Sequence, residues 1–342
     1  MKAAVLQRPR QIDVKDVPDP IIEDYDVLCK TLAASICGGT DNHIVRNHPY
    51  FKVIFPTIIG HEGIGQVIAC GNKVRYFKEG DLITRIHNKL PLKSDYAIQY
   101  GAFAEKSVAT DWQAMREDGL VKAIWKKFTV HRVLPPEFDP IASTMIITWR
   151  ETRSFLDRMK ITPDNIILII GSGANALSFA NHTMNSGIET LIIGSPIRKT
   201  YFSKLGLDIF LPYNEKNPKR IIRNIGYKTI DVIIDTIGKS EAVNRLLPVL
   251  SIGGKVGVYG LDSFNDYNLN TFNAAGDFAY YSGEIYDEGS AHDAVIADII
   301  NEKLNAWDYL SKDHIYPLEK INEALDATLT RKTLKSVIKF NY

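Results

Sequence analysis

A continuous apolar segment, Ile166–Ile170, runs directly into the sequence Gly171-Ser172-Gly173-Ala174-Asn175-Ala176. A strand without polar alternation is typical of a parallel sheet that is covered on both faces. The pattern continues, because apolar segments at 190–193, 230–235 and 255–260 alternate with stretches of helical periodicity. This alternation predicts an α/β domain built around a parallel sheet.

Helices are expected over 151–160, from the glycine-rich loop to about 186, over 198–205 and over 241–250. Ser240 is the predicted N-cap of the last of these, because a serine hydroxyl can accept from a free backbone N–H. Near the C-terminus we expect two amphipathic helices, over 291–304 and 318–329, and a strand over 336–340.

The first 100 or so residues have a different pattern, with short strands such as 27–32 and 65–70 between turns rich in Gly and Pro. Helical periodicity is weak in this part, which indicates an irregular all-β barrel. The segment 108–135 follows, and its apolar side chains, including Trp112 and Trp125, predict a short packed helix or a lid.

The glycine-rich loop has the composition of a dinucleotide-binding turn. Gly171 permits a tight turn, Gly173 allows the backbone to approach a pyrophosphate, and Ala176 is small enough for close packing of helix on strand. The helix that begins near Ala174 and Asn175 would present its N–H groups to the phosphates. The alternative is a glycine-rich turn that binds nothing.

The residues after the second strand distinguish the two nicotinamide dinucleotides. A site for NAD usually has an acid there, to accept from the ribose 2′-hydroxyl. The segment 194–199 contains no carboxylate, whereas Ser195 together with Arg198 or Lys199 suits a 2′-phosphate. We therefore expect NADP(H) in preference to NAD(H), although Arg198 and Lys199 could instead form a solvated helix face.

The charge balance, with 41 Lys and Arg against 40 Asp and Glu, gives no reason to expect a nucleic-acid partner. No apolar segment approaches the roughly 20 residues of a membrane helix, and the N-terminus does not resemble a secretory signal. The three cysteines, Cys29, Cys37 and Cys70, are too few for a disulfide framework. Cys29 and Cys70 are expected to pack in strands, and the protein is expected in the cytoplasm.

Three segments of the N-terminal half carry a resemblance to a known family. They are ICGGTDNH at 36–43, GHEG at 60–63, and Val74 followed by Gly80-Asp81. In this order, ahead of a nucleotide-binding pattern, they resemble the signatures of zinc-dependent medium-chain alcohol/polyol dehydrogenases. The resemblance covers nearly the whole chain, and it implies a GroES-like β-barrel catalytic domain (1–148 and 283–342) with a Rossmann-type domain (149–282) between its two parts.

The resemblance also implies an activity, which is hydride transfer between a small-molecule alcohol or carbonyl substrate and the nicotinamide cofactor. A polyol, sugar or sugar-derived alcohol is the preferred substrate, and a homodimer or homotetramer is the expected assembly. Zn²⁺ would bind Cys37, His61 and Glu62, which are suitable donor types, and Asp41 would orient the ring of His61. The resemblance further implies a proton relay from Thr40 to His43 through the cofactor ribose.

The sequence departs from the family pattern in three places. The cysteine loop has an extra glycine, and residues 81–100 contain no cysteine, which excludes a four-cysteine structural zinc site. Relatives carry another zinc ligand at a position that corresponds here to Ile146 or Ile147. Glu151, one turn later, could serve as a ligand or a catalytic group, or it could be a surface carboxylate. Arg150 could recognise an anionic group of the substrate.

Two other functions fit the same residues. In a zinc-free NADPH reductase of the quinone or enone type, Cys37 and His61 would be relics, and the missing ligand at 146–147 favours this alternative. A catalytically inactive NADP(H)-binding protein is the second alternative. The presence of Thr40 and His43 argues against it, because a protein that only binds the cofactor needs no proton relay.

Overall fold

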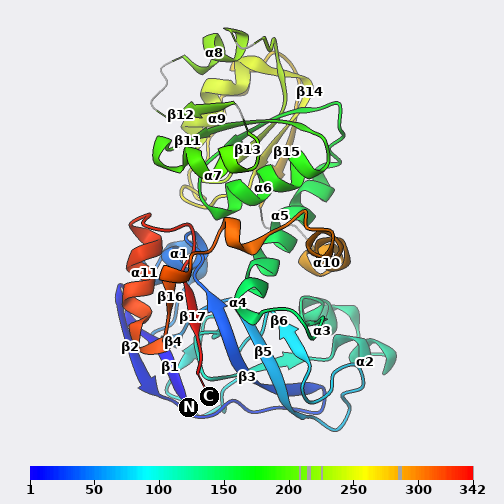
Figure 1. Ribbon diagram of the computed structural model, residues 1–342, viewed down its shortest axis with the longest axis vertical. Coiled ribbons are helices and arrows are strands. Elements are labelled where there is room, and N and C mark those ends of the chain that lie inside the picture. The colour runs from blue at the N-terminus through cyan, green and yellow to red at the C-terminus, as the bar shows by residue number, and fades with distance from the viewer. Residues whose placement is uncertain (208, 214–216, 225, 284–286, 342) are drawn as a thin grey trace. The chain divides into compact units, whose positions relative to one another are not determined.

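The structure, a computed structural model, describes residues 1–207, 209–213, 217–224, 226–283 and 287–341 of the 342-residue chain (Figure 1). The chain divides into two compact units. Unit 1 comprises residues 1–150, 288–297 and 305–342, and unit 2 comprises residues 151–287 and 298–304.

Unit 1 is built mainly from short strands that form two sheets. The smaller sheet has the order β2-β1-β4-β7, and the larger has the order β16-β17-β3-β5-β6-β9, with β8 also paired to β3. The strands are β1 (Lys2–Arg8), β2 (Gln11–Asp16), β3 (Asp26–Ser35), β4 (Thr57–Ile58), β5 (Glu62–Cys70), β6 (Leu82–Thr84), β7 (Ala97–Ile98), β8 (Lys106–Thr110), β9 (Arg132–Leu134), β16 (Ile315–Tyr316) and β17 (Val337–Lys339).

The core of unit 1 lies between these strands and a few short helices. Val27, Ile36, Ile59 and Phe103 are fully buried in one apolar cluster, to which helix α11 contributes Ile321. The helices are α1 (Thr40–Val45), α2 (Trp112–Glu117), α3 (Lys122–Trp125), α4 (Pro140–Ser143) and α11 (Ile321–Leu329). Two more, α5 (Met145–Met159) and α10 (His292–Ile300), begin in unit 1 and continue into unit 2.

Unit 2 contains a six-stranded sheet in the order β12-β11-β10-β13-β14-β15, in which every pair of neighbours is parallel. The apolar strands of its centre are buried, as expected for a sheet with covered faces. Its elements are β10 (Ile166–Ile170), α6 (Ala174–Asn185), β11 (Glu189–Gly194), α7 (Lys199–Lys204), β12 (Phe210–Pro212), α8 (Pro218–Asn224), β13 (Ile230–Asp235), α9 (Ser240–Leu246), β14 (Leu250–Val258) and β15 (Ala279–Ser282).

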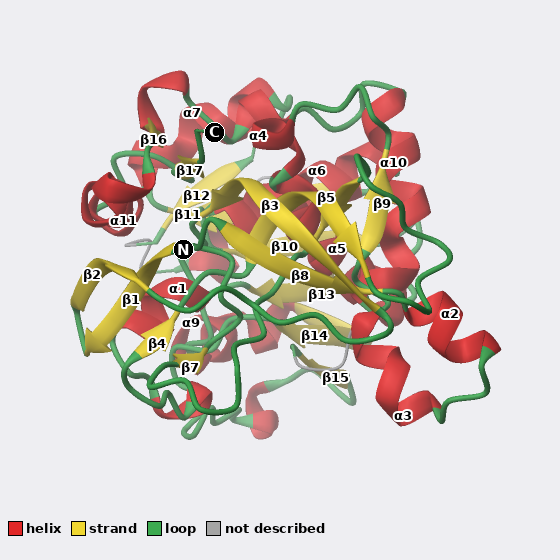
Figure 2. Cartoon of the chain, turned by 90° about the horizontal axis from the view of Figure 1, so that it is seen from below, coloured by secondary structure: helices red, strands yellow, loops and turns green. Residues whose placement is uncertain are grey.

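The predicted fold class is confirmed, because a parallel-sheet α/β unit accompanies a unit of short strands (Figure 2). Among the described residues, every helix is too short or too polar to span a bilayer. The prediction that Ser240 caps α9 is wrong. Lys239, in an extended conformation, is the N-cap and makes no side-chain capping bond. Asp235 instead accepts from the backbone N–H groups of the preceding turn, including that of Lys239.

The segment predicted to be a packed helix or lid forms α2, α3 and a 3₁₀ turn at Lys126–Phe128. The rings of Trp112 and Trp125 stack on each other, with centroids 6.1 Å apart. Figure 2 shows α2 and α3 at one margin of the larger sheet. The tryptophan pair shows that the apolar side chains in this segment pack locally.

A pair of histidines lies next to this segment. The backbone N–H of Thr110 donates to Nδ1 of His131, so neutral His131 carries its proton on Nε2. That Nε2 lies 3.2 Å from Nδ1 of His87 and donates to it. Burial lowers the pKa of His87 to about 4, and it also lowers the pKa of His131 well below its ordinary value. Both rings are therefore neutral in the folded protein near neutral pH.

The histidine pair should make the protein sensitive to mild acid. The unfolded chain protonates His87 as the pH falls through 6.5, whereas the folded chain resists until about 4, so stability declines between these values. The full effect is of the order of 3 kcal/mol. We expect the midpoint of urea unfolding to fall less in His87→Asn than in the wild type when the pH is lowered from about 7 to about 5.

Phe128→Leu is the matched control, because the Phe128 ring lies against both histidines but does not titrate. This variant should unfold at lower urea at both pH values and keep the wild-type pH dependence. Equal pH dependence in His87→Asn and the wild type would contradict the assignment of the acid sensitivity to this pair.

Candidate metal centre and nucleotide site

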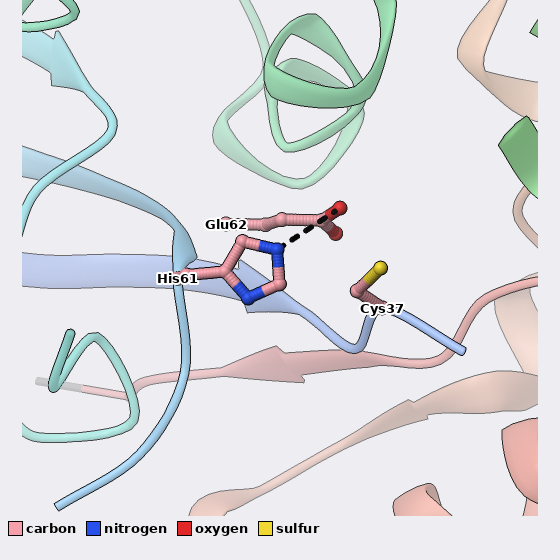
Figure 3. A group of neighbouring side chains, drawn as sticks. All are labelled: Cys37, His61 and Glu62. Carbon is pink, nitrogen blue, oxygen red and sulfur yellow. Dashed lines mark ion pairs between the residues drawn. The ribbon is translucent and has the colours of Figure 1, made fainter. Parts of the chain in front are cut away.

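Three buried side chains of unit 1 bring a sulfur, a nitrogen and a carboxylate oxygen together (Figure 3). The ligand atoms of Cys37, His61 and Glu62 all lie within 4.8 Å of one another. Nε2 of His61 is 3.9 Å from Oε1 of Glu62. Thiolate, imidazole and carboxylate are the donor types that Zn²⁺ takes in proteins, and three protein ligands leave a position for substrate. The residues therefore fit a catalytic zinc ion.

The local backbone explains why these residues meet. Cys37 lies two residues beyond the end of β3, and Glu62 begins the neighbouring strand β5. Gly60, just before His61, has φ +98°, and a Cβ atom there would lie 2.6 Å from the ring of Phe103. Only glycine fits both the backbone conformation and the space. The turn that presents His61 therefore depends on Gly60.

Asp41 links two of the three donors. Its Oδ2 accepts from the backbone N–H of Cys37 at 2.8 Å, and its Oδ1 lies 3.1 Å from Nδ1 of His61. Burial opposes protonation of His61, but the charge and hydrogen bond of Asp41, together with Cys37, raise the pKa of the ring well above its ordinary value. The hydrogen bond between Asp41 and Nδ1 fixes the orientation of the ring, with Nε2 on the side of Glu62.

Three further side chains, which the sequence analysis missed, surround the carboxylate of Glu62. Ser35 Oγ and Lys335 Nζ donate to Oε2, and Thr148 Oγ1 donates to Oε1. Burial would raise the pKa of Glu62, but the charge of Lys335, then His61 and the hydrogen bonds, hold it below the ordinary value. Glu62 is thus an ionised carboxylate in the core of unit 1.

The proposed relay residues lie on one short helix. Thr40 is the first residue of α1 and His43 is the fourth, so both lie on the same face. The extra glycine of the cysteine loop, Gly39, is the N-cap of this helix. His48 lies beside His43, with ring centroids 4.6 Å apart.

Helix α5 carries both the position of the missing ligand and Glu151, the residue considered in its place. Ile146 and Ile147 are fully buried in α5. Glu151, farther along α5, belongs to unit 2, where its Oε2 accepts from the hydroxyl of Tyr259 at 3.1 Å. It is only 6% exposed, so the alternative of a surface carboxylate is wrong. That Glu151 binds the metal or acts in catalysis stays a prediction.

Arg150 and the two other cysteines also have definite surroundings. Arg150 is fully buried, donates to Glu288 and lies 3.2 Å from Nδ1 of His292, so its guanidinium is already engaged within unit 1. Cys29 is buried in the core of unit 1, as expected. The expectation that Cys70 packs is wrong, because it is exposed at the end of β5.

The glycine-rich loop in unit 2 joins β10 to α6. Gly171 has φ +135°, and a Cβ atom there would lie 1.9 Å from Oγ1 of Thr236, so glycine is required. A Cβ atom on Gly173, the N-cap of α6, would meet nothing within 4 Å. The loop therefore has the strand–turn–helix context of a dinucleotide site, with open space beside its second glycine.

The end of β11 lies beside this loop. The backbone N–H of Ser195 donates to Oγ of Ser172 at 3.0 Å, which ties the two strand ends together. Arg198 is only 5% exposed and its guanidinium lies 5.5 Å from the ring centre of Tyr201, whereas Lys199 is exposed. Arg198 is therefore not part of a solvated helix face, whereas Lys199 is exposed at the start of α7.

Comparison with known proteins relates the chain to alcohol and polyol dehydrogenases. The family model described as alcohol dehydrogenase GroES-like domain matches residues 23–118. Sorbitol dehydrogenase of Bacillus subtilis (strain 168) is 27% identical over 279 residues, which cover 79% of this chain and 78% of the relative. D-arabinitol dehydrogenase 1 of Uromyces fabae is 23% identical over 357 residues, covering 100% and 97%.

The solved structure of alcohol dehydrogenase TADH from Thermus sp. ATN1 has the same fold. It superposes with a TM-score of 0.81 at 20% identity, over 100% of both chains. Together with the fold and the metal-binding side chains, these findings support the zinc-type medium-chain dehydrogenase family for this chain. It is an NAD(P)-dependent oxidoreductase of the alcohol dehydrogenase type.

Proposed function

We propose that this protein is a zinc-dependent dehydrogenase that interconverts a polyol, sugar or sugar-derived alcohol and its carbonyl compound with NADP(H). The observation that carries the proposal is the buried group of Cys37, His61 and Glu62. Relatives named sorbitol dehydrogenase, D-arabinitol dehydrogenase 1 and L-galactonate-5-dehydrogenase support a polyhydroxylated substrate.

Residues of this chain would bind the metal, orient its ligands and accept the proton of the substrate. Cys37, His61 and Glu62 would hold Zn²⁺, and Asp41 would keep the imidazole in the orientation that it has in the structure. Zinc bound there would polarise the oxygen of the substrate. Thr40 Oγ1 would accept the proton of the substrate hydroxyl, and His43, one turn along α1, would be the final base.

The nucleotide would bind at the carboxyl edge of the sheet in unit 2. The open space at Gly173 and the N-terminus of α6 suit a pyrophosphate. The absence of an acid in residues 194–199, together with the cations at 198 and 199, supports a 2′-phosphate on the ribose. These features favour NADP(H) over NAD(H).

Zinc content tests the metal site. Protein purified without chelator should contain about one zinc per chain, and Cys37→Ser should lose both the zinc and the oxidation of polyols. Cys70→Ser is the matched control, because Cys70 is exposed and outside the metal group, and it should keep both. A folded, metal-free wild type that still turns over would refute the proposal and favour a zinc-free reductase.

Steady-state kinetics with the two cofactors tests the nucleotide preference. In Arg198→Ala, kcat/KM for NADP should fall about 10- to 100-fold, as expected when a hydrogen bond to a charged group is lost. The value for NAD should change little, because NAD lacks the 2′-phosphate. Lys199→Ala shows whether the neighbouring exposed cation shares the role. A wild type that prefers NAD would overturn this part of the proposal.

A further inference from the structure

The ammonium group of Lys335 is buried beside a predicted metal ligand. Lys335 is 1% exposed and Glu62 is fully buried, and the two form an ion pair. Removing a lysine from water is costly unless its charge is compensated closely. A buried lysine at this position therefore depends on Glu62, and the carboxylate depends on the lysine in turn.

The register of three neighbouring strands brings these groups together. Ser35, at the end of β3, is opposite Glu62 on β5 and opposite Val337 on β17. Lys335 lies two residues before Val337, so it approaches the carboxylate from the β17 side. The pair joins residues 273 positions apart in the sequence, and backbone pairing holds the segments that carry it.

The two oxygens of Glu62 have different surroundings. Oε2 accepts from Lys335 Nζ and from Ser35 Oγ, the latter at 2.5 Å. Oε1 accepts from Thr148 Oγ1 at 3.0 Å and is the oxygen that lies 3.9 Å from Nε2 of His61 (Figure 3). Oε1 is thus the oxygen that faces the imidazole of His61, while Oε2 accepts hydrogen bonds from a cation and a hydroxyl.

A carboxylate can bind a metal ion through one oxygen or through both. If Glu62 used both, it would take up the position that a catalytic zinc site keeps for substrate. We propose that Lys335 is a positioning residue that, with Ser35, keeps Oε2 engaged, so that Glu62 offers the metal Oε1 alone. This inference rests on the metal site of the proposed function.

The sequence of α5 gives the engagement of Oε2 by Lys335 and Ser35 more weight. Ile146 and Ile147, where relatives carry a ligand, are buried and apolar, so α5 supplies Thr148 to Oε1 in place of a metal donor. Glu62 is then the third protein donor of the group. The way its carboxylate is held decides how many positions remain open on the metal.

Lys335→Met tests the inference. Freed from its cation, Glu62 should bind through both oxygens, so metal affinity should stay equal to or exceed that of the wild type while kcat falls about 10- to 100-fold. The protein loaded with Co²⁺ reports coordination directly, because five-coordinate cobalt absorbs visible light more weakly than four-coordinate cobalt. We expect the visible absorption to weaken in Lys335→Met and to be retained in Lys335→Arg, which preserves the cation.

Two further variants complete the experiment. Lys320→Met removes an exposed lysine of unit 1 and should match the wild type in affinity, spectrum and kcat. Ser35→Ala removes the hydroxyl from Oε2 but leaves the cation, and it should shift the spectrum in the same direction by a smaller amount. Should Lys335→Met fail to fold, Ser35→Ala and Lys335→Arg decide the question.

The outcomes separate the two proposals. A wild type that binds neither cobalt nor zinc refutes the metal site itself. A wild type that binds metal, beside a Lys335→Met variant with unchanged spectrum and kcat, refutes the role of Lys335. Loss of metal affinity in step with activity would also refute it, because that is the result for a lysine that merely holds the site together.

Discussion

The arrangement of Cys37 and His61 depends first on the carboxylate of Asp41, which is fully buried and contacts both residues. One oxygen holds the backbone of Cys37 and the other holds the ring of His61. A buried carboxylate without such partners would be strongly destabilising, so its hydrogen bonds and the geometry of the site stabilise each other. Gly60 adds the backbone conformation that brings His61 to this oxygen.

Unit 1 also contains buried charged side chains that form ion pairs with one another. Lys335 pairs with Glu62, and Arg150 pairs with Glu288, both below the surface of the same unit. Such pairs contribute little net stability compared with apolar packing, but loss of one partner leaves a charge without compensation. At the metal group, the ion pair with Lys335 holds Oε2 of Glu62 in place.

The amino-acid sequence predicted those features that depend on residues close together in the chain. The parallel sheet followed from apolar strands that alternate with helices, and the resemblance of short motifs to a known family singled out Cys37, His61 and Glu62, which the structure brings together. Lys335 had no such signal, since it meets Glu62 only when β17 pairs with β3. The capping of α9 failed for a similar reason, because the turn before it is held by Asp235 and not by the adjacent Ser240. The burial of Arg198 likewise depends on tertiary packing.

One sulfur, one imidazole and one carboxylate of this chain would hold the zinc ion of the proposed site. X-ray absorption at the zinc edge of the purified protein measures these ligands. We expect one sulfur at about 2.3 Å and the remaining nitrogen and oxygen ligands at about 2.0–2.2 Å. Two or more sulfur ligands, or zinc surrounded by oxygen alone, would contradict the proposed site, because Cys37 is the only cysteine in the group.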